Sequence, residues 1–214
     1  MAAAICASTS TAALAQEAGD IQVRILGTGV LPDGKITDVI TAGPVPAGTQ
    51  TAASDNYVPT AAIEYFLMDN FSIETICCVT QHDVDATAGP LAGAELVSDA
   101  LLVPATLTVK YHIPAGVVRP YVGAGATYFI WLQDKPGADT IPLGVTRQDL
   151  SSELGLVLQA GVDVDVSESM FVSLDAKRYW VDTTAKWYAG NTLAIETEHK
   201  LDPWVLSAGV GFRF

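Results

Sequence analysis

The chain ends in Trp204-Val205-Leu206-Ser207-Ala208-Gly209-Val210-Gly211-Phe212-Arg213-Phe214, a stretch in which apolar residues alternate with mostly small or polar ones. Side chains on a strand point to opposite faces in turn, so one face of this segment is wholly apolar and has aromatic rings at both ends. Strands of outer-membrane barrels show this pattern where they face lipid. We therefore interpret the segment as the closing strand of such a barrel. Its residues Ser207, Gly209, Phe212 and Phe214 are typical of the C-terminal signal that the barrel-insertion machinery reads.

The composition agrees with a membrane barrel of one domain. Half of the 214 residues are hydrophobic and the mean hydropathy is +0.32. Yet no run of about 18 apolar residues follows the N-terminus, so the sequence offers no transmembrane helix. Apolar residues at alternate positions explain both observations. The net charge of −13 excludes nucleic acid as a partner, because no basic surface could neutralise phosphates.

The first fifteen residues are typical of an export signal. They are rich in Ala and other small residues, and Ala13-Leu14-Ala15 is an A-x-A cleavage pattern before Gln16. No Lys or Arg follows Met1, so a disordered Ala-, Ser- and Thr-rich tail is the alternative, as is a start codon at another position. We predict a signal peptide over residues 1–15 and a barrel domain over 16–214.

Seven further alternating segments precede the last one, at 21–30, 57–66, 71–79, 103–113, 119–131, 154–166 and 170–180. Short turns alternate with four long segments that we expect to be loops, at 31–56, 80–102, 132–149 and 181–201. Eight strands connected in this way predict an all-β protein, an eight-stranded antiparallel up-and-down transmembrane β-barrel with long extracellular loops and short periplasmic turns. Both termini are then periplasmic, and a barrel closed on itself is expected to be a monomer.

A soluble eight-stranded barrel or sandwich is the competing architecture, with its apolar face inward. The polar face here is rich in Gly, Ser and Thr, whereas a water-facing surface would be charged. Aromatic residues also gather near strand ends, where membrane-interface anchors belong. These predicted anchors are Tyr57, Phe71, Tyr111, Tyr121, Trp131, Trp180 and Trp204.

The inward face of the predicted barrel collects charged residues, and acids outnumber bases among them. An eight-stranded barrel has little space beyond its own side chains. We therefore favour a network of ion pairs that braces the barrel over a selectivity ring or a proton-linked gate, because buried charges need partners. The predicted members are Arg24, Glu64, Glu74, Lys110, His112, Glu153, Asp163, Asp165, Asp175, Lys177 and Arg213.

Two prolines lie near the outer ends of predicted strands, Pro59 and Pro104. Proline has no N–H and cannot complete a ladder of hydrogen bonds, so it occurs at edges, strand starts or bulges. Two ordinary strand starts would explain the pair. The functional alternative is a lateral portal, a weak place in the wall where an apolar solute leaves into lipid.

Other chemistry is weakly supported. The stretch Gln81-His82-Asp83-Val84-Asp85 has too few ligands for a metal site, and His199 between Glu198 and Lys200 is expected at the surface. Ser54-Asp55, His82-Asp83 and Ser98-Asp99 supply residue types for nucleophilic catalysis, but no Gly-x-Ser-x-Gly pattern is present. Adjacent Cys77 and Cys78 point to opposite faces of a strand, to lipid and to the interior. We predict no enzyme, no metal and no cofactor.

Several short motifs occur in order along the whole chain after residue 20. They are Tyr65-Phe66 followed by Asp69-Asn70, Pro104-Ala105-Thr106-Leu107 leading to Tyr111, Arg119-Pro120-Tyr121-Val122-Gly123-Ala124-Gly125, Gln159-Ala160-Gly161 with Asp163, and Asp202-Pro203-Trp204 before Phe214. This ordered set resembles the outer-membrane protein W (OmpW) family. The resemblance implies a monomeric eight-stranded barrel in the outer membrane of a Gram-negative cell. It also implies a narrow lumen for small hydrophobic molecules.

Taken with this resemblance, the sequence predicts passage or binding of small hydrophobic solutes, with outer-membrane lipid and the insertion machinery as further partners. The alternative is a structural or surface-interaction protein of the outer membrane, a receptor or stress-related component that transports nothing.

Overall fold

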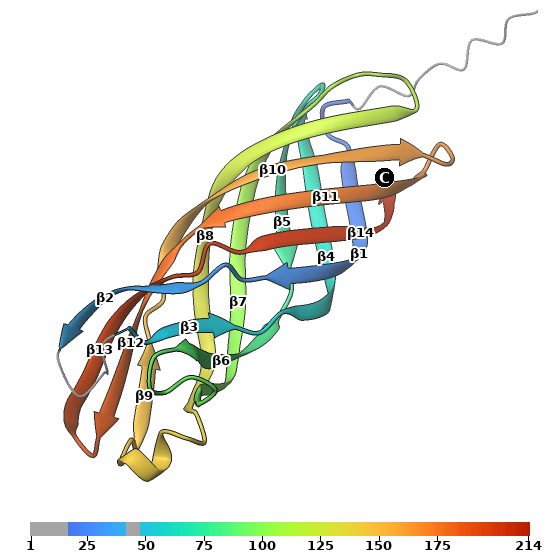
Figure 1. The fold of residues 1–214 in the computed structure, drawn as a ribbon. Coiled ribbons are helices and arrows are strands. Elements are labelled where there is room, and N and C mark those ends of the chain that lie inside the picture. Colours follow the sequence, from blue (N-terminus) through green and yellow to red (C-terminus); the bar gives the residue numbers. More distant parts are fainter. Residues whose placement is uncertain (1–16, 42–47) are drawn as a thin grey trace, which may run out of the picture.

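The computed structural model of the protein describes residues 17–41 and 48–214, which consist mainly of β-strands (Figure 1). The helical content of these residues is one 3₁₀ turn, η1 (Ile141–Leu143). Within the described ranges, no helix is long and apolar enough to span a bilayer. The predicted export signal, residues 1–15, lies outside the described residues.

Eight strands form a closed barrel, as predicted. Each is antiparallel to its neighbours, and β14 pairs with both β11 and β1, which closes the sheet. A closed sheet leaves no unpaired edge facing the apolar part of a membrane. The barrel strands are β1 (Ile21–Leu31), β4 (Asn56–Met68), β5 (Phe71–Cys77), β7 (Glu95–His112), β8 (Val118–Pro136), β10 (Leu154–Asp165), β11 (Met170–Trp180) and β14 (Trp204–Arg213).

The two ends of the barrel differ. At the end we call the turn end, short connections join β4 to β5, β7 to β8 and β10 to β11, and β1 begins beside the end of β14. At the other end, which we call the extended end, the chain continues well beyond the barrel (Figure 1).

Alternation along the strands sorts side chains between the outer surface and the interior. On β14, Trp204 and Leu206 are exposed, whereas Val205 and Ser207 are buried. Exposed aromatic side chains form two belts on the outer surface, as expected where a barrel meets the two membrane interfaces. One belt, at the turn end, contains Tyr65, Phe71, Tyr111, Phe212 and Phe214, and the other contains Tyr57, Tyr128, Trp180 and Trp204.

Two of the predicted interface anchors point inward instead. Tyr121 is buried in the barrel, and its hydroxyl donates to Asp175 Oδ2 at 2.8 Å. The Trp131 indole N–H donates to the Ser151 carbonyl oxygen at 3.0 Å. Both residues occupy odd positions of β8, like the buried Phe129, so strand alternation overrides their nearness to a strand end.

The segments predicted as long loops are largely strands. β6 pairs with β3 and with the first half of β7, while β2, β13, β12 and β9 form a separate four-stranded sheet (Figure 1). Many Pro, Gly and Asp residues favoured loops, but Thr, Val and Trp at alternate positions favour strands. The additional strands are β2 (Lys35–Thr41), β3 (Gln50–Ala53), β6 (Thr80–Ala88), β9 (Arg147–Leu150), β12 (Asp182–Ala189) and β13 (Thr192–Lys200).

The wall of the barrel has a break at Cys78 and Val79. The predicted strand over 71–79 ends at Cys77, and the chain resumes pairing with β7 only at Thr80. On the other side of the break, β4 continues beyond Ala61, the last residue that it pairs with β5.

Candidate functional site

The barrel interior toward the turn end is filled by a group of charged side chains that we call the barrel network. Arg24 on β1 is 1% exposed, and its Nη1 atom lies 2.5 Å from Glu64 Oε2 and 2.8 Å from Glu74 Oε2. Its Nη2 atom lies 2.9 Å from Asp163 Oδ2 on β10. One planar guanidinium, which has donors in several directions, therefore connects β4, β5 and β10 across the lumen.

Two residues of β7 join the same carboxylates. Lys110 Nζ lies 2.9 Å from Glu64 Oε2 and 2.9 Å from Glu74 Oε2. His112 Nε2 lies 2.6 Å from Glu64 Oε1, which also accepts a short hydrogen bond from the Ser72 hydroxyl. Each Glu64 oxygen thus has a partner, as a buried charge requires.

Strand β11 adds a second ion pair, on the side of the network that faces the extended end. Lys177 Nζ lies 2.7 Å from Asp175 Oδ1 and 3.2 Å from Glu74 Oε1. Gln159 on β10 donates from Nε2 to both carboxylates, at 2.7 Å to Asp175 and 2.9 Å to Glu74. The two groups of charges are therefore continuous.

Closer to the turn end, two arginines share one acid. Asp165 Oδ1 lies 2.6 Å from Arg119 Nη2 and 3.1 Å from Arg213 Nη2. Both guanidinium groups lie over the Phe171 ring, at 5.4 Å and 5.8 Å from its centre. Arg213 thus lies inside, near the end of the closing strand.

The barrel network is balanced in charge. The predicted set had more acids than bases because it included Glu153 and omitted Arg119. Glu153 precedes β10, and its side chain has no ion pair among the described residues. Arg119, Tyr121 and Gln159 were missed as members of the network, although Arg119 and Tyr121 occupy odd positions of β8, like the buried Phe129. Five cations, Arg24, Lys110, Arg119, Lys177 and Arg213, face five carboxylates, Glu64, Glu74, Asp163, Asp165 and Asp175.

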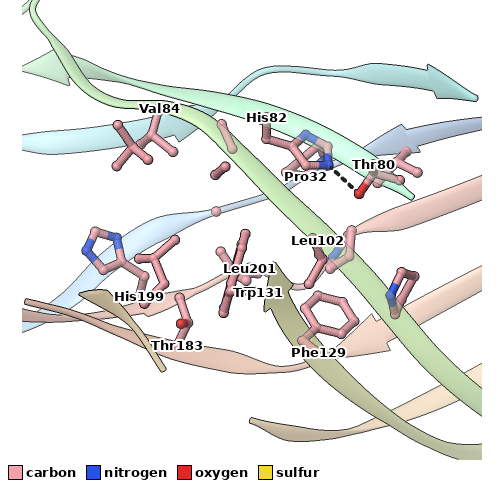
Figure 2. Close-up of a pocket in the computed structure, with 18 of the residues that line it drawn as sticks. Pro32, Thr80, His82, Val84, Leu102, Phe129, Trp131, Thr183, His199 and Leu201 are labelled. Carbon is pink, nitrogen blue, oxygen red and sulfur yellow. Dashed lines mark hydrogen bonds between the residues drawn. The ribbon is translucent and has the colours of Figure 1, made fainter. Parts of the chain in front are cut away.

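Toward the extended end the interior becomes apolar. Leu102, Phe129 and Tyr179 belong to a buried layer next to the barrel network, and Ala100 and Trp187 belong to a second layer farther toward the extended end. A cavity lined by both layers lies between the strands of the extended end, and we call it the outer chamber. Figure 2 shows part of its lining, with Leu102 on β7, Phe129 and Trp131 on β8, and Leu201 just after β13.

Two histidines line the outer chamber (Figure 2). His82 Nδ1 lies 2.6 Å from the Ser54 carbonyl oxygen, which can only accept, so Nδ1 carries the proton and Nε2 accepts from the Thr80 hydroxyl at 3.1 Å. His199 Nε2 lies 2.7 Å from Thr197 Oγ1. Burial lowers the pKa of both imidazoles, to about 4 for His199, because the chamber disfavours charge. His199 was expected at the surface and is buried.

The candidate catalytic residues do not form a Ser–His pair. Asp83 donates its backbone N–H to Ser54 Oγ at 3.0 Å, and the Ser98 hydroxyl donates to Glu95 Oε1 at 2.6 Å. Among the described residues, no group of three or more His, Cys, Asp or Glu could hold a metal ion.

The proposed assembly residues lie where β14 meets β1. The hydroxyls of Ser207 and Thr28 are 2.8 Å apart. A Cβ atom on Gly209 would lie 2.1 Å from the Ile25 carbonyl oxygen, so only glycine allows this approach. Phe212 and Phe214 are exposed on the outer surface.

The portal candidates flank the break in the wall. Pro104 lies on β7 between Thr106, which pairs with Ile76 of β5, and Leu102, which pairs with Thr80 of β6. Pro59 lies on the part of β4 that extends past β5. Cys78, in the break, lines the outer chamber, whereas Cys77 is exposed.

Comparison with known proteins matches the pattern of the OmpW family to residues 17–214. The chain belongs to the OmpW family. The uncharacterized outer-membrane protein y4mB of Sinorhizobium fredii is 32% identical over 90% of this chain and 79% of its own length. The dibenzothiophene metabolism operon protein PahQ of Pseudomonas aeruginosa is 29% identical over 89% of this chain and 87% of its own length.

A solved structure agrees with the family. The crystal structure of the outer membrane protein OprG from Pseudomonas aeruginosa matches with a TM-score of 0.83 and 25% identity, and the match covers 93% of this chain and 97% of that one. The protein is an outer-membrane barrel of this family, and its surroundings are lipid.

Proposed function

We propose that the protein binds small apolar molecules in its outer chamber and passes them into the outer membrane. The observation that carries this proposal is the change of the interior from charged to apolar along one tube. An apolar solute gains free energy by leaving water for the chamber, at roughly 25 cal/mol per Å² of buried apolar surface. It gains nothing from the barrel network, whose charges already have partners.

The name of one relative supports this solute class. PahQ is named for an operon of dibenzothiophene metabolism, and dibenzothiophene is a flat, apolar aromatic molecule. Phe129, Trp131 and Trp187 give the outer chamber aromatic walls suited to such rings.

The route that we propose leaves the chamber sideways. The barrel network fills the lumen, whereas the break at Cys78 lies beside the chamber and between Pro59 and Pro104. Neither proline can donate to a neighbouring strand, so the wall there has fewer hydrogen bonds to open. The lateral portal is therefore the exit, and the barrel network braces the wall.

The remaining features follow the same proposal. The extended end faces the exterior, the two termini face the periplasm, and the barrel acts as a monomer without a covalent step or a cofactor. Residues 1–15 act as the export signal and 16–214 as the barrel domain. Ser207, Gly209, Phe212 and Phe214 direct insertion by the barrel-insertion machinery.

A substitution that fills the chamber with a larger side chain tests the proposal. Ala185 lines it and is buried, whereas Ala189 on the same strand is exposed, so Ala189→Phe is a matched control for Ala185→Phe. We expect Ala185→Phe to bind naphthalene at least about tenfold more weakly than the wild type, since a phenyl ring would occupy the solute's place. Heat-modifiable migration on a gel first establishes that each variant is folded. Equal naphthalene binding by both folded variants would refute the proposal.

A surface-interaction function is the second candidate, and it rests on charge. The segments 32–59, 78–104, 131–152 and 181–203 contain fourteen Asp and Glu against five Lys and Arg. Such a surface suits a basic partner. Loss of naphthalene binding without loss of the protein's cellular role would favour this candidate.

A further inference from the structure

Two buried polar side chains at the outer end of the chamber have no partner. Gln148 on β9 is 3% exposed, and neither its amide nitrogen nor its amide oxygen has a hydrogen bond within the described structure. Trp187 on β12 is 7% exposed, and its indole Nε1–H is likewise without an acceptor. Burying a polar atom without a hydrogen bond is unfavourable, so a partner for these three atoms would stabilise the site.

The strand register places the two side chains together and toward the chamber. Gln148 is directly opposite Trp187. The next pair on the same face, toward the barrel, is Leu150 opposite Ala185. Side chains opposite each other on neighbouring strands share a face, with Cβ atoms about 5 Å apart. Trp187, Leu150 and Ala185 all line the outer chamber, so Gln148 lies on the face that forms its wall.

The outward face of β9 is already satisfied. Arg147 and Asp149 flank Gln148 in sequence and pair with each other at 2.6 Å, with both side chains more than half exposed. Gln148 alone among these three turns inward, into an apolar layer that includes Val97 and Ala100. The unpaired amide is therefore a feature of the chamber.

A second tryptophan shows that the fold can satisfy an indole in this region. Trp131 also lines the chamber, and its Nε1–H donates to the Ser151 carbonyl oxygen at 3.0 Å. Trp187 has no such acceptor, although it packs in the same region and lies beside a free amide. The Trp187 indole N–H therefore faces the chamber as a donor without an acceptor in the described structure.

We propose that Gln148 and Trp187 anchor an uncharged hydroxyl-type group of a small apolar molecule whose body lies in the outer chamber. This inference rests on the proposed function and names its solute class. The Trp187 indole only donates, whereas the Gln148 amide both donates and accepts. A hydroxyl, with one donor and two acceptor lone pairs, matches this set, and so does a carboxamide.

Charged groups are selected against. The chamber lining includes Lys35 and Lys200, but both are exposed to water, and the buried cations described above belong to the barrel network. A carboxylate beside Gln148 and Trp187 would therefore lose its hydration without gaining a buried ion pair. The acidic excess of the extended end repels anions further. Neutral alcohols and phenols thus fit better than acids.

The experiment compares four probes with one apolar body: naphthalene, 1-methoxynaphthalene, 1-naphthol and 1-naphthoate. Binding to the folded protein in detergent is corrected for each probe's partition into empty micelles. We expect wild-type protein to prefer 1-naphthol to naphthalene by about tenfold, which corresponds to one or two net hydrogen bonds. The ether, which cannot donate, should fall between them, and the carboxylate should bind most weakly.

The variants assign the preference to these residues. Gln148→Leu and Trp187→Phe should each reduce the preference for 1-naphthol and leave naphthalene binding within about twofold. Gln133→Leu is the matched control, because Gln133 is exposed on β8. Trp187→Phe keeps an aromatic ring, so it carries the test alone if Gln148→Leu does not fold.

The outcomes are distinguishable. Naphthalene binding with no preference for 1-naphthol overturns this inference and leaves the proposed function intact, with water as the occupant of the polar site. A preference that survives both variants also overturns it. Failure of all four probes to bind refutes the proposed function itself.

Discussion

The barrel network and the outer chamber are two stretches of one tube, built by the same alternation of side chains, and they differ in what points inward. In the network, Arg24 and Lys110 have carboxylate partners within 3 Å. In the chamber, the inward positions are mostly apolar, and Gln148 and Trp187 have polar atoms without partners. Every charged group of the network has an ion-pair partner, although single atoms such as Arg24 Nε and Asp163 Oδ1 make no hydrogen bond. The Gln148 amide, in contrast, has no partner for either of its polar atoms.

The contrast separates two tasks of a small barrel. Charges that are fully paired hold strands together but offer nothing to a solute. An apolar space offers burial to a solute but adds little bracing.

Removal of the central cation should have the largest effect on stability. Arg24→Leu leaves Glu64, Glu74 and Asp163 close together without their shared partner. We expect a loss of about 3–5 kcal/mol in the free energy of unfolding, as is typical when one side of a buried pair is removed. Urea unfolding in lipid, followed by heat-modifiable migration, measures the loss.

The control for this change is Arg178→Leu. Arg178 pairs with Asp33 at 3.3 Å, but the Asp33 side chain is largely exposed. Water screens such a pair, so we expect less than about 1 kcal/mol from its removal. Equal losses for the two variants would show that the network does not brace the barrel.

Closing the wall beside the chamber should reduce solute uptake several-fold. In Pro59→Val with Pro104→Val, both positions regain a backbone N–H that can complete the ladder. Uptake of naphthalene by cells without their own proteins of this family measures the effect. Pro120→Val, on β8 at the turn end, is the matched control and should leave uptake unchanged. Unchanged uptake by a folded double variant would remove the lateral portal.

We expect the extended end, which contains the chamber, to be less stable at acid pH than at neutral pH. The pKa of His199 is lowered to about 4 by burial, whereas an unfolded histidine titrates near 6.5. The neutral imidazole therefore adds stability above pH 6.5, and this contribution is lost as the pH falls toward 4. Its upper limit is about 3 kcal/mol, and it concerns the extended end alone.

The measurement is tryptophan fluorescence, because Trp187 and His199 have ring centres 6.4 Å apart. His199→Gln should flatten the change between pH 6.5 and 4 relative to the wild type. His82, whose pKa is lowered in the same direction, accounts for the remainder. Identical pH profiles for variant and wild type would contradict the assignment to His199.

The sequence predicted the barrel well because alternation is a local property. The eight strands, the exposed face of β14 and the inward position of Arg213 all follow from a period of two. Alternation also carries Arg119 and Tyr121 inward, and reading β8 by parity would have found them.

The outer chamber could not be predicted in this way. It depends on pairing between distant segments, such as Trp187 with Gln148 and Thr80 with Leu102. The expected loops contain many turn-forming residues, and tertiary pairing overrode that local preference. An unpartnered amide is likewise visible only when its neighbours are known.

We propose that apolar solutes use the outer chamber while the barrel network closes the lumen. Naphthalene uptake by cells and ion conductance in planar bilayers, both measured on the wild-type and Ala185→Phe proteins, test this claim. We expect uptake that Ala185→Phe abolishes, together with little ion conductance in either protein. Uptake that persists in folded Ala185→Phe, alongside steady ion conductance through the barrel, would contradict the claim.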